Sequence, residues 1–336
     1  MTATVKRALR ITGALDVMRR MTAAGRIDIL LYHGFCEGSV RDRRFPKLMP
    51  VGLFERQLQL LVRHARPLYL GELANGANQG VVLTFDDGYA SNYHLAFPVL
   101  QKHGFPATIF LTTGFVDRTV PLWGDRLEFL LASAPCRDTS FEWRNEHIAL
   151  PLAAAGVRDA VVTELKQHLH EMAIADIHDF LGSLEGHLGI NYEWDRAPQA
   201  LRPLDWDQIR AMRRSGLVSF GSHTVSHPVL SRCPDAVQEY EIVESKNRVE
   251  TELGESCPIF AYPYGKNGDF SEVTKRIAAQ AGNTLVLTAE SGSNVPSPAG
   301  RLDLKRWGAD IGADELCFIV SGGPAFSGYA RRTFRH

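Results

Sequence analysis

One short apolar stretch that runs directly into two carboxylates constrains this chain more than any other. Residues 81–85 read Val-Val-Leu-Thr-Phe, which predicts a buried β-strand, and Asp86, Asp87 and Gly88 follow immediately. Neighbouring strand residues point to opposite faces, so the two carboxylates share a site only if the chain turns there, which Gly88 permits. Parallel α/β folds place their chemistry at the carboxyl ends of such strands. The alternative is a solvated Asp-Gly turn.

A second motif carries two histidines four residues apart, His223 and His227, after the apolar pair at residues 217–218. On one helical turn, or in a compact loop, this spacing brings the two imidazoles together. Two histidines and one carboxylate form a common zinc ligand set, in which the fourth position stays open to water. An exposed helix face would carry the same spacing, but the two carboxylates after a predicted strand favour a metal site.

These stretches resemble motifs of the polysaccharide deacetylases, also called the NodB-homology domain or carbohydrate esterase family 4. Residues 84–88 and 223–227 are similar to the first two motifs, and residues 260–265 (Phe-Ala-Tyr-Pro-Tyr-Gly) are similar to the third. Residues 29–33 resemble the opening strand of the branch that contains bacterial poly-N-acetylglucosamine deacetylases, and residues 105–110 resemble the second strand. The resemblance implies an α/β fold, a distorted (β/α) barrel with a largely helical insertion.

Removal of an N-acetyl group is amide hydrolysis, which a bound metal assists by polarising the carbonyl and lowering the pKa of a water. We assign Asp87, His223 and His227 as the ligands, and the resemblance implies the same set with Asp86 as the base. The alternative role for Asp86 is to orient a ligating histidine. We expect a divalent metal, zinc first, although cobalt, nickel and manganese also suit these ligands.

Two positions depart from the family's pattern. Many members carry an acid histidine in a Leu-x-x-His pattern near the end of the domain, but after residue 227 this chain has only His336. The branch that contains bacterial poly-N-acetylglucosamine deacetylases has a histidine after the first strand instead, and His33 fits that position. The resemblance therefore implies His33 as the general acid, the alternative being a structural histidine bonded to a backbone carbonyl. Many members also pair the base with an arginine in the third motif, where this chain has Ala261. Arg306 is the candidate replacement, and a surface arginine is the alternative.

Aromatic residues near the predicted strand ends are candidates to contact a sugar. Tyr264 and Trp307 both follow predicted strands, so we expect them to stack on sugar rings, and Trp123 is a further candidate. Pro263 lies in the turn that shapes the predicted groove. The backbone N–H of Tyr89 is a candidate oxyanion donor.

The chain divides into three predicted parts. Residues 1–26 form a basic amphipathic helix, residues 27–320 form the barrel, and residues 321–336 form a basic tail. Residues 121–203 interrupt the barrel as a largely helical insertion, a candidate lid or acceptor platform. Five histidines of the insertion lack a carboxylate at ligand spacing, so we do not expect them to bind metal: His147, His168, His170, His178 and His187. The N-terminal helix either lies on an anionic membrane surface or packs on the barrel.

Composition restricts the partners and the compartment. The net charge of −1 gives no reason to expect nucleic acid, and five scattered cysteines indicate reduced thiols. Residues 1–26 contain no apolar run of signal-peptide length, and no stretch approaches a membrane span. We therefore expect a cytoplasmic protein, with peripheral contact at the inner membrane left open, and we make no prediction of its oligomeric state.

Three functions are compatible with these features. The first is a metal-dependent hydrolase that removes N-acetyl groups from an amino-sugar glycan in exopolysaccharide or cell-envelope biosynthesis. The second is a deacetylase or deformylase of a lipid-linked sugar at the cytoplasmic membrane face, which the basic ends of the chain favour. The third is a catalytically silent glycan-binding domain. It is disfavoured because the sequence keeps both aspartates and both histidines.

Overall fold

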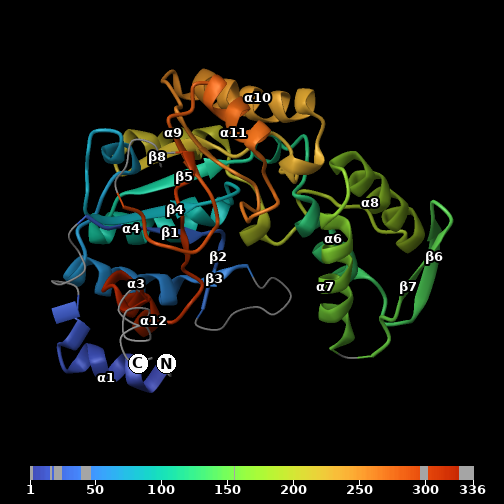
Figure 1. Cartoon of the computed structure of the whole chain (residues 1–336). Coiled ribbons are helices and arrows are strands. Elements are labelled where there is room, and N and C mark those ends of the chain that lie inside the picture. The colour runs from blue at the N-terminus through green and yellow to red at the C-terminus, as the bar shows by residue number, and fades with distance from the viewer. Residues whose placement is uncertain are drawn as a thin grey trace, which may run out of the picture.

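The centre of the molecule is a seven-stranded parallel sheet in the order β10-β9-β8-β5-β4-β1-β11 (Figure 1). The computed structural model describes residues 3–15, 17–18, 25–38, 47–154, 156–295 and 302–324. The strands are β1 (Ile27–Tyr32), β4 (Gly80–Phe85), β5 (Ala107–Leu111), β8 (Val218–Ser222), β9 (Ile259–Ala261), β10 (Leu285–Leu287) and β11 (Trp307–Gly308). All six pairings are parallel, in agreement with the predicted α/β class.

One segment near the C-terminus joins the two edges of this sheet. Leu304 forms a parallel bridge with Leu287 of β10, supported by the hydrogen bond from Thr288 N to Leu304 O at 2.8 Å. Three residues later, Trp307 pairs with Leu30 of β1. Because the same segment contacts β10 and β1, the sheet curves round into a distorted barrel, as expected for the resembled fold.

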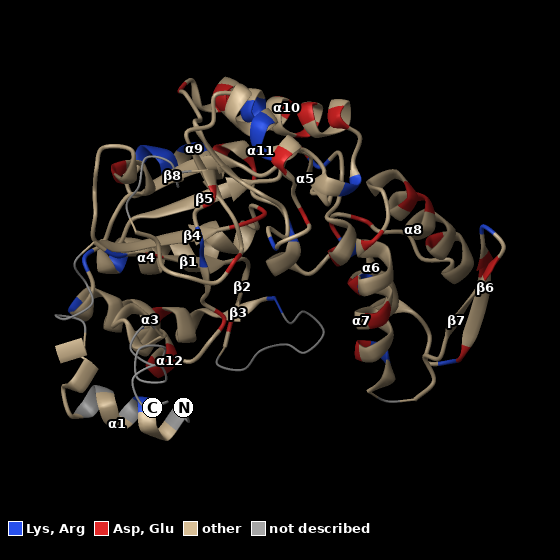
Figure 2. Ribbon diagram, in the orientation of Figure 1, with Lys and Arg blue, Asp and Glu red and all other residues tan. Residues whose placement is uncertain are grey.

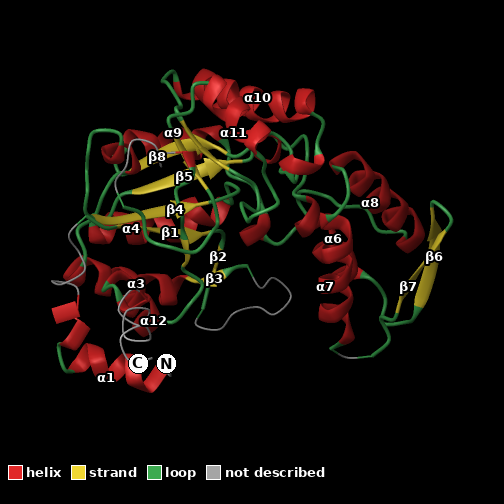
Figure 3. Ribbon diagram, in the orientation of Figure 1, coloured by secondary structure: helices red, strands yellow, loops and turns green. Residues whose placement is uncertain are grey.

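Helices cover the outer face of the sheet (Figure 3). They are α3 (Val51–His64), α4 (Phe97–His103), α9 (Trp206–Arg214), α10 (Asp235–Leu253), α11 (Glu272–Gln280) and α12 (Ala313–Val320). Shorter elements are α5 (Thr113–Val116), η1 (Leu70–Leu73), η2 (Asn92–Ala96), η4 (Leu230–Arg232) and the strand pair β2 (Phe35–Cys36) and β3 (Met49–Pro50). Every residue of β4 is buried, as expected for a central strand covered on both faces. The carboxyl end of β4 is therefore a rigid place from which to present Asp86 and Asp87.

The insertion forms a second body beside the barrel, on the right of Figure 1. It contains α6 (Trp123–Ser133), β6 (Thr139–Trp143), β7 (Glu146–Leu150), α7 (Val157–His170), α8 (Ile174–Leu188) and η3 (Gln199–Leu201), and its apolar side chains form their own core. The expectation of a largely helical segment is wrong for residues 139–150, which form an antiparallel hairpin. Arg144 and Asn145 turn the hairpin at positive φ, and the alternating burial of Phe141 and Trp143 is typical of a strand.

The described part of the N-terminal segment packs on the barrel. Helix α1 (Ala3–Ile11) lies against α12, and Lys6 forms an ion pair with Glu315. Leu15 and Met18 are buried with Phe318 of α12. Most of the basic tail, residues 325–336, lies outside the described residues. Lys and Arg are interspersed with Asp and Glu over the barrel and the insertion (Figure 2). Among the described residues, no helix is both long and apolar enough to cross a membrane.

Candidate active site

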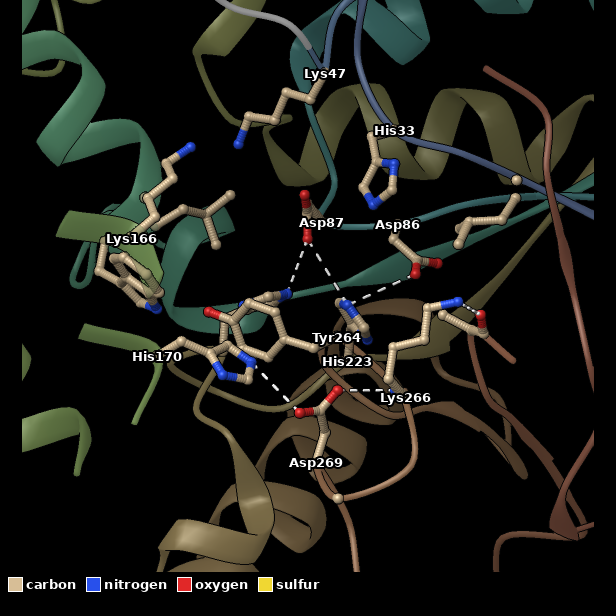
Figure 4. A pocket seen from close by; sticks show the side chains of 18 of the residues that line it. His33, Lys47, Asp86, Asp87, Lys166, His170, His223, Tyr264, Lys266 and Asp269 are labelled. Atoms are coloured by element: carbon tan, nitrogen blue, oxygen red, sulfur yellow. Dashed lines mark hydrogen bonds and ion pairs between the residues drawn. The ribbon is translucent and has the colours of Figure 1, made fainter. Parts of the chain in front are cut away.

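Asp87, His223 and His227 come together at the carboxyl end of the sheet. Figure 4 shows Asp87 and His223 facing each other. Asp87 follows β4, and His223 directly follows β8. One ligand atom from each residue lies within 4.8 Å of the others. Asp87 Oδ1 lies 3.3 Å from His227 Nε2 and 3.7 Å from His223 Nε2. The structure thus brings together the three residues that the sequence singled out as ligands.

The backbone around these residues adopts conformations that are uncommon for non-glycine residues. Asp87 has φ 75°, Thr224 has φ 67° and His227 has φ 60°, all in the left-handed region. Gly88 continues the turn after Asp87 with φ 89°. This turn lets both carboxylates face one site instead of opposite faces of the strand. Such conformations cost of order 1–3 kcal/mol each and cluster at functional sites.

The side chains of this cluster suit a divalent metal. His223 Nδ1 donates to the backbone oxygen of Ala261 at 2.7 Å, which leaves the Nε2 lone pair facing the site. Burial lowers the pKa of His223 to about 4, so the imidazole is neutral, as a ligand must be. Asp87 Oδ1 is buried and accepts no hydrogen bond from a described residue. A cation would complete this otherwise costly arrangement.

A buried carboxylate on α10 holds the loop between the two histidines. Glu241 Oε2 accepts hydrogen bonds from the backbone N–H groups of Val225 and Ser226, at 2.7 and 2.9 Å. Glu241 Oε1 accepts from Ser226 Oγ, and Thr224 Oγ1 accepts from the backbone N–H of His227 at 3.1 Å. Sequence reasoning missed Glu241, because it lies outside the motifs and its partners are backbone groups.

Arg306 and Asp86 form a buried, two-pronged ion pair. Both distances between the guanidinium nitrogens and the carboxylate oxygens are 2.7 Å, and Arg306 Nε donates to Thr288 O. Arg306 is 1% exposed, so the surface-arginine alternative is wrong. Burial favours a raised pKa for Asp86, but the charges of Arg306 and His223 outweigh it and lower the pKa. Asp86 is therefore ionised, and it lies 3.8 Å from His223 Nε2.

His33 follows β1 and lines the same pocket, with its ring beside Asp86 and Asp87 in Figure 4. Burial lowers the pKa of His33, against the opposing charges of Asp87 and Asp86. The imidazole is thus positioned to exchange a proton near the carboxylates.

The pocket has a volume of about 830 Å³ and lies between the barrel and the insertion. The barrel contributes His33, Asp86, Asp87, His223, His227 and Tyr264. The ring of Tyr264 meets that of His227 edge-on at 4.8 Å. The insertion contributes Leu122, Trp123, Gly124, Lys166, His170 and Glu171. Both bodies therefore shape the space in which a substrate would lie.

Three predicted substrate contacts do not reach the wall of this pocket. Gly308 lines it instead of Trp307, because neighbouring strand residues face opposite sides, and Trp307 Nε1 donates to Ser293. Pro263 is buried within the turn. The Tyr89 side chain is fully buried and donates to Asp125 at 2.8 Å, while its backbone role stays a prediction. Tyr264 and Trp123 do line the pocket.

Sequence reasoning missed several charged residues of the pocket. Lys47 pairs with Asp125, and Lys166 pairs with Glu128. Asp125 and Glu128 are buried residues of α6 in the insertion. His170 lies in the pocket but outside the metal cluster. None of these residues belongs to a motif, and their convergence depends on how the insertion packs beside the barrel.

Comparisons with known proteins show the family of this chain. A family model described as polysaccharide deacetylase matches residues 74–286, more than half of the chain. The chain belongs to the polysaccharide deacetylase family, whose members are hydrolases of N-acetyl amide bonds. The resemblance stated from the motifs is thereby confirmed.

Individual relatives are distant. The Bacillus subtilis (strain 168) protein YxkH is 22% identical over 271 residues, which are 80% of this chain and 66% of that protein. The Streptococcus pyogenes deacetylase PplD, solved in complex with acetate, has a TM-score of 0.56 at 21% identity, covering 89% of this chain and 99% of PplD. IcaB from Ammonifex degensii has a TM-score of 0.55 at 20% identity, and the match covers 89% of this chain and 97% of IcaB. These structures confirm the (β/α) barrel fold.

Proposed function

We propose that this chain is a metal-dependent N-deacetylase of an amino-sugar glycan in exopolysaccharide or cell-envelope biosynthesis. The observation that carries the proposal is the cluster of Asp87, His223 and His227 beside a second, ionised carboxylate, Asp86. A cluster built only for structure has no need of two buried carboxylates and two histidines around an unsatisfied oxygen.

In this proposal Asp87, His223 and His227 hold a divalent metal, zinc first, with cobalt, nickel or manganese as alternatives. Such a metal would polarise the amide carbonyl and lower the pKa of a water. The role of Asp86 is to accept the proton of the attacking water. Its pairing with Arg306 keeps the carboxylate ionised and fixes its direction, at some cost to its basicity.

His33 protonates the leaving amine in this proposal. The ring lies beside both carboxylates at the pocket. Because burial lowers its pKa, the imidazolium form is a stronger acid than an exposed histidine. Tyr264 forms an aromatic wall for the sugar.

The first test measures metal content and acetate release from N-acetylglucosamine oligomers on the same samples. The wild type is compared with His223→Ala and with His147→Ala, an exposed insertion histidine that pairs with Glu142. We expect about one metal per chain in the wild type and in the control, and loss of both metal and acetate release in His223→Ala. A wild type that takes up no metal after reconstitution would overturn the proposal.

A lipid-linked sugar at the cytoplasmic membrane face is the second candidate substrate. The basic character of residues 1–26 supports it. The packing of α1 on α12 counts against it, because Lys6, Leu15 and Met18 are then directed to the barrel. Metal uptake without acetate release from free oligosaccharides, together with sedimentation of the chain with anionic vesicles, would favour the lipid-linked substrate.

A further inference from the structure

The insertion has its own apolar core and meets the barrel at the pocket. Leu127, Leu130, Leu169 and Phe180 are fully buried within it. Tyr264 of the third motif packs against this core, so it lies between the insertion and the metal site. Tyr264 thereby fixes where the insertion lies relative to Asp87, His223 and His227.

The insertion presents three hydrogen-bond donors to the pocket, from Trp123, Lys166 and His170. Trp123 is 4% exposed, and its Nε1–H makes no well-aligned hydrogen bond to a described residue, although the Tyr264 side chain lies near enough to interact with it. A buried donor without a partner costs roughly 1–3 kcal/mol, so such a donor in a pocket wall points to a ligand acceptor. Lys166 pairs with Glu128 and still has further N–H groups to donate.

His170 is held in place from the third-motif loop. Its Nε2 lies 3.3 Å from Asp269 Oδ1, while Asp269 Oδ2 accepts from the backbone N–H of Lys266 at 2.8 Å. The ring of His170 meets that of Tyr264 edge-on, with centroids 4.7 Å apart (Figure 4). The ring of Tyr264 in turn meets that of His227 at 4.8 Å. One aromatic ring therefore separates His170 from a metal ligand, which places His170 about one sugar ring away from the reaction.

The charges on this wall are balanced. Lys166 faces Glu128, His170 faces Asp269, and Glu171 pairs with Arg232. On the insertion side each cation thus faces a carboxylate, so this wall offers donors with little net charge, whereas Lys266 on the barrel side of the pocket donates to the backbone oxygen of Ala289. Two aromatic rings, Trp123 and Tyr264, lie 6.4 Å apart beside these donors. Donors next to aromatic faces suit the hydroxyl oxygens and C–H faces of a neutral sugar.

We propose that Trp123, Lys166 and His170 form a subsite on the insertion that binds the sugar unit next to the one that loses its acetyl group. This inference rests on the proposed deacetylase function. It makes the insertion the part of the chain that selects an oligosaccharide over a single sugar.

The test compares His170→Gln with His168→Gln on three substrates: N-acetylglucosamine, its trisaccharide and a small aryl acetate ester. His168 lies on the same helix but does not line the pocket. We expect His170→Gln to raise the KM for the trisaccharide about tenfold with kcat little changed, as for loss of one charge-assisted hydrogen bond. Hydrolysis of the monosaccharide and the ester, and the metal content, should stay at wild-type levels, as should every reading for His168→Gln.

Other results would overturn the subsite. Equal trisaccharide KM values in wild type and His170→Gln, or a parallel loss on the ester, would show that His170 does not bind the neighbouring sugar. If the metal-loaded wild type hydrolyses the ester but no glycan, the proposed function fails separately. Calorimetry then measures trisaccharide binding directly, and an unchanged Kd in His170→Gln would also reject the subsite.

Discussion

Arg306 donates from both terminal nitrogens to both carboxylate oxygens of Asp86, at 2.7 Å each, from the segment that joins β10 to β1. The third-motif position at which the resemblance led us to expect an arginine is Ala261 in this chain, and its backbone oxygen accepts from His223 Nδ1. The same electrostatic partner for Asp86 is thus supplied by a segment 45 residues further along the sequence.

Replacing Arg306 with alanine should reduce both turnover and stability. We expect kcat to fall by about 10–100-fold, as for loss of a residue that orients a reacting group. Loss of one partner from a buried pair costs about 3–5 kcal/mol, so denaturant midpoints should also fall. The double variant Asp86→Asn/Arg306→Ala should be more stable than Arg306→Ala, because no unpaired charge remains. Unchanged turnover in Arg306→Ala would reject a role for this pair.

The pH dependence of turnover should reveal His33 if it is the acid. Burial lowers its pKa, so the proton-bearing form is lost as the pH rises through a value below that of an exposed histidine. We expect kcat to fall on the alkaline side. In His33→Gln we expect kcat to fall by roughly 100-fold or more, with that pH dependence removed. A His33→Gln profile of unchanged shape would assign the alkaline limb to another group.

Glu241 should control metal affinity without touching the metal. Its carboxylate holds the loop that carries His227 through two backbone N–H groups. In Glu241→Gln one carboxylate oxygen is replaced by an NH2 group, which cannot accept a hydrogen bond from Val225 or Ser226. Because the loop would then hold His227 less firmly, we expect metal affinity to weaken about 10–100-fold in a chelator competition. Glu239→Gln, at an exposed position of the same helix, is the matched control. Equal affinities in the two variants would mean that the loop holds its shape without Glu241.

The ion pair between His170 and Asp269 should make stability depend on pH. The hydrogen bond to Asp269 raises the pKa of His170 above its usual value, although burial opposes it. The pair therefore contributes its full stability below about pH 6.5 and loses it as the pH rises through the folded-state pKa. We expect the stability difference between wild type and Asp269→Asn to shrink from pH 6 to pH 9. A difference that is constant over this range would contradict the ion pair.

The barrel and the cluster of Asp87, His223 and His227 could be predicted from the sequence because short apolar strands and the polar residues that follow them are visible as local patterns. Asp87 lies two residues after β4 and His223 directly follows β8, and the carboxyl ends of parallel strands meet at one edge of the sheet. Arg306 could be inferred only by elimination, from the missing arginine at residue 261. Its contact with Asp86 spans 220 residues, and no local pattern encodes it.

Sequence reasoning failed where the position of a side chain depends on a shift of one residue along a strand, or on how the insertion packs against the barrel. Trp307 and Gly308 are neighbours on a strand, and the face that each one takes cannot be read from strand order alone. The hairpin at residues 139–150 was missed although Phe141 and Trp143 alternate with exposed residues. His170 and Lys166 reach the pocket only because the insertion docks beside the third-motif loop.

The segment that joins β10 to β1 also carries Arg306. Docking of this segment therefore closes the barrel and supplies the counter-ion of Asp86 at the same time. During synthesis this segment leaves the ribosome late, after both histidines and both aspartates have been made. A nascent chain that ends before residue 304 would contain Asp87, His223 and His227, the proposed metal ligands, while Asp86 lacked its counter-ion. Such a chain could bind a cation before it could turn over substrate, so full activity would begin only when the final strand docks.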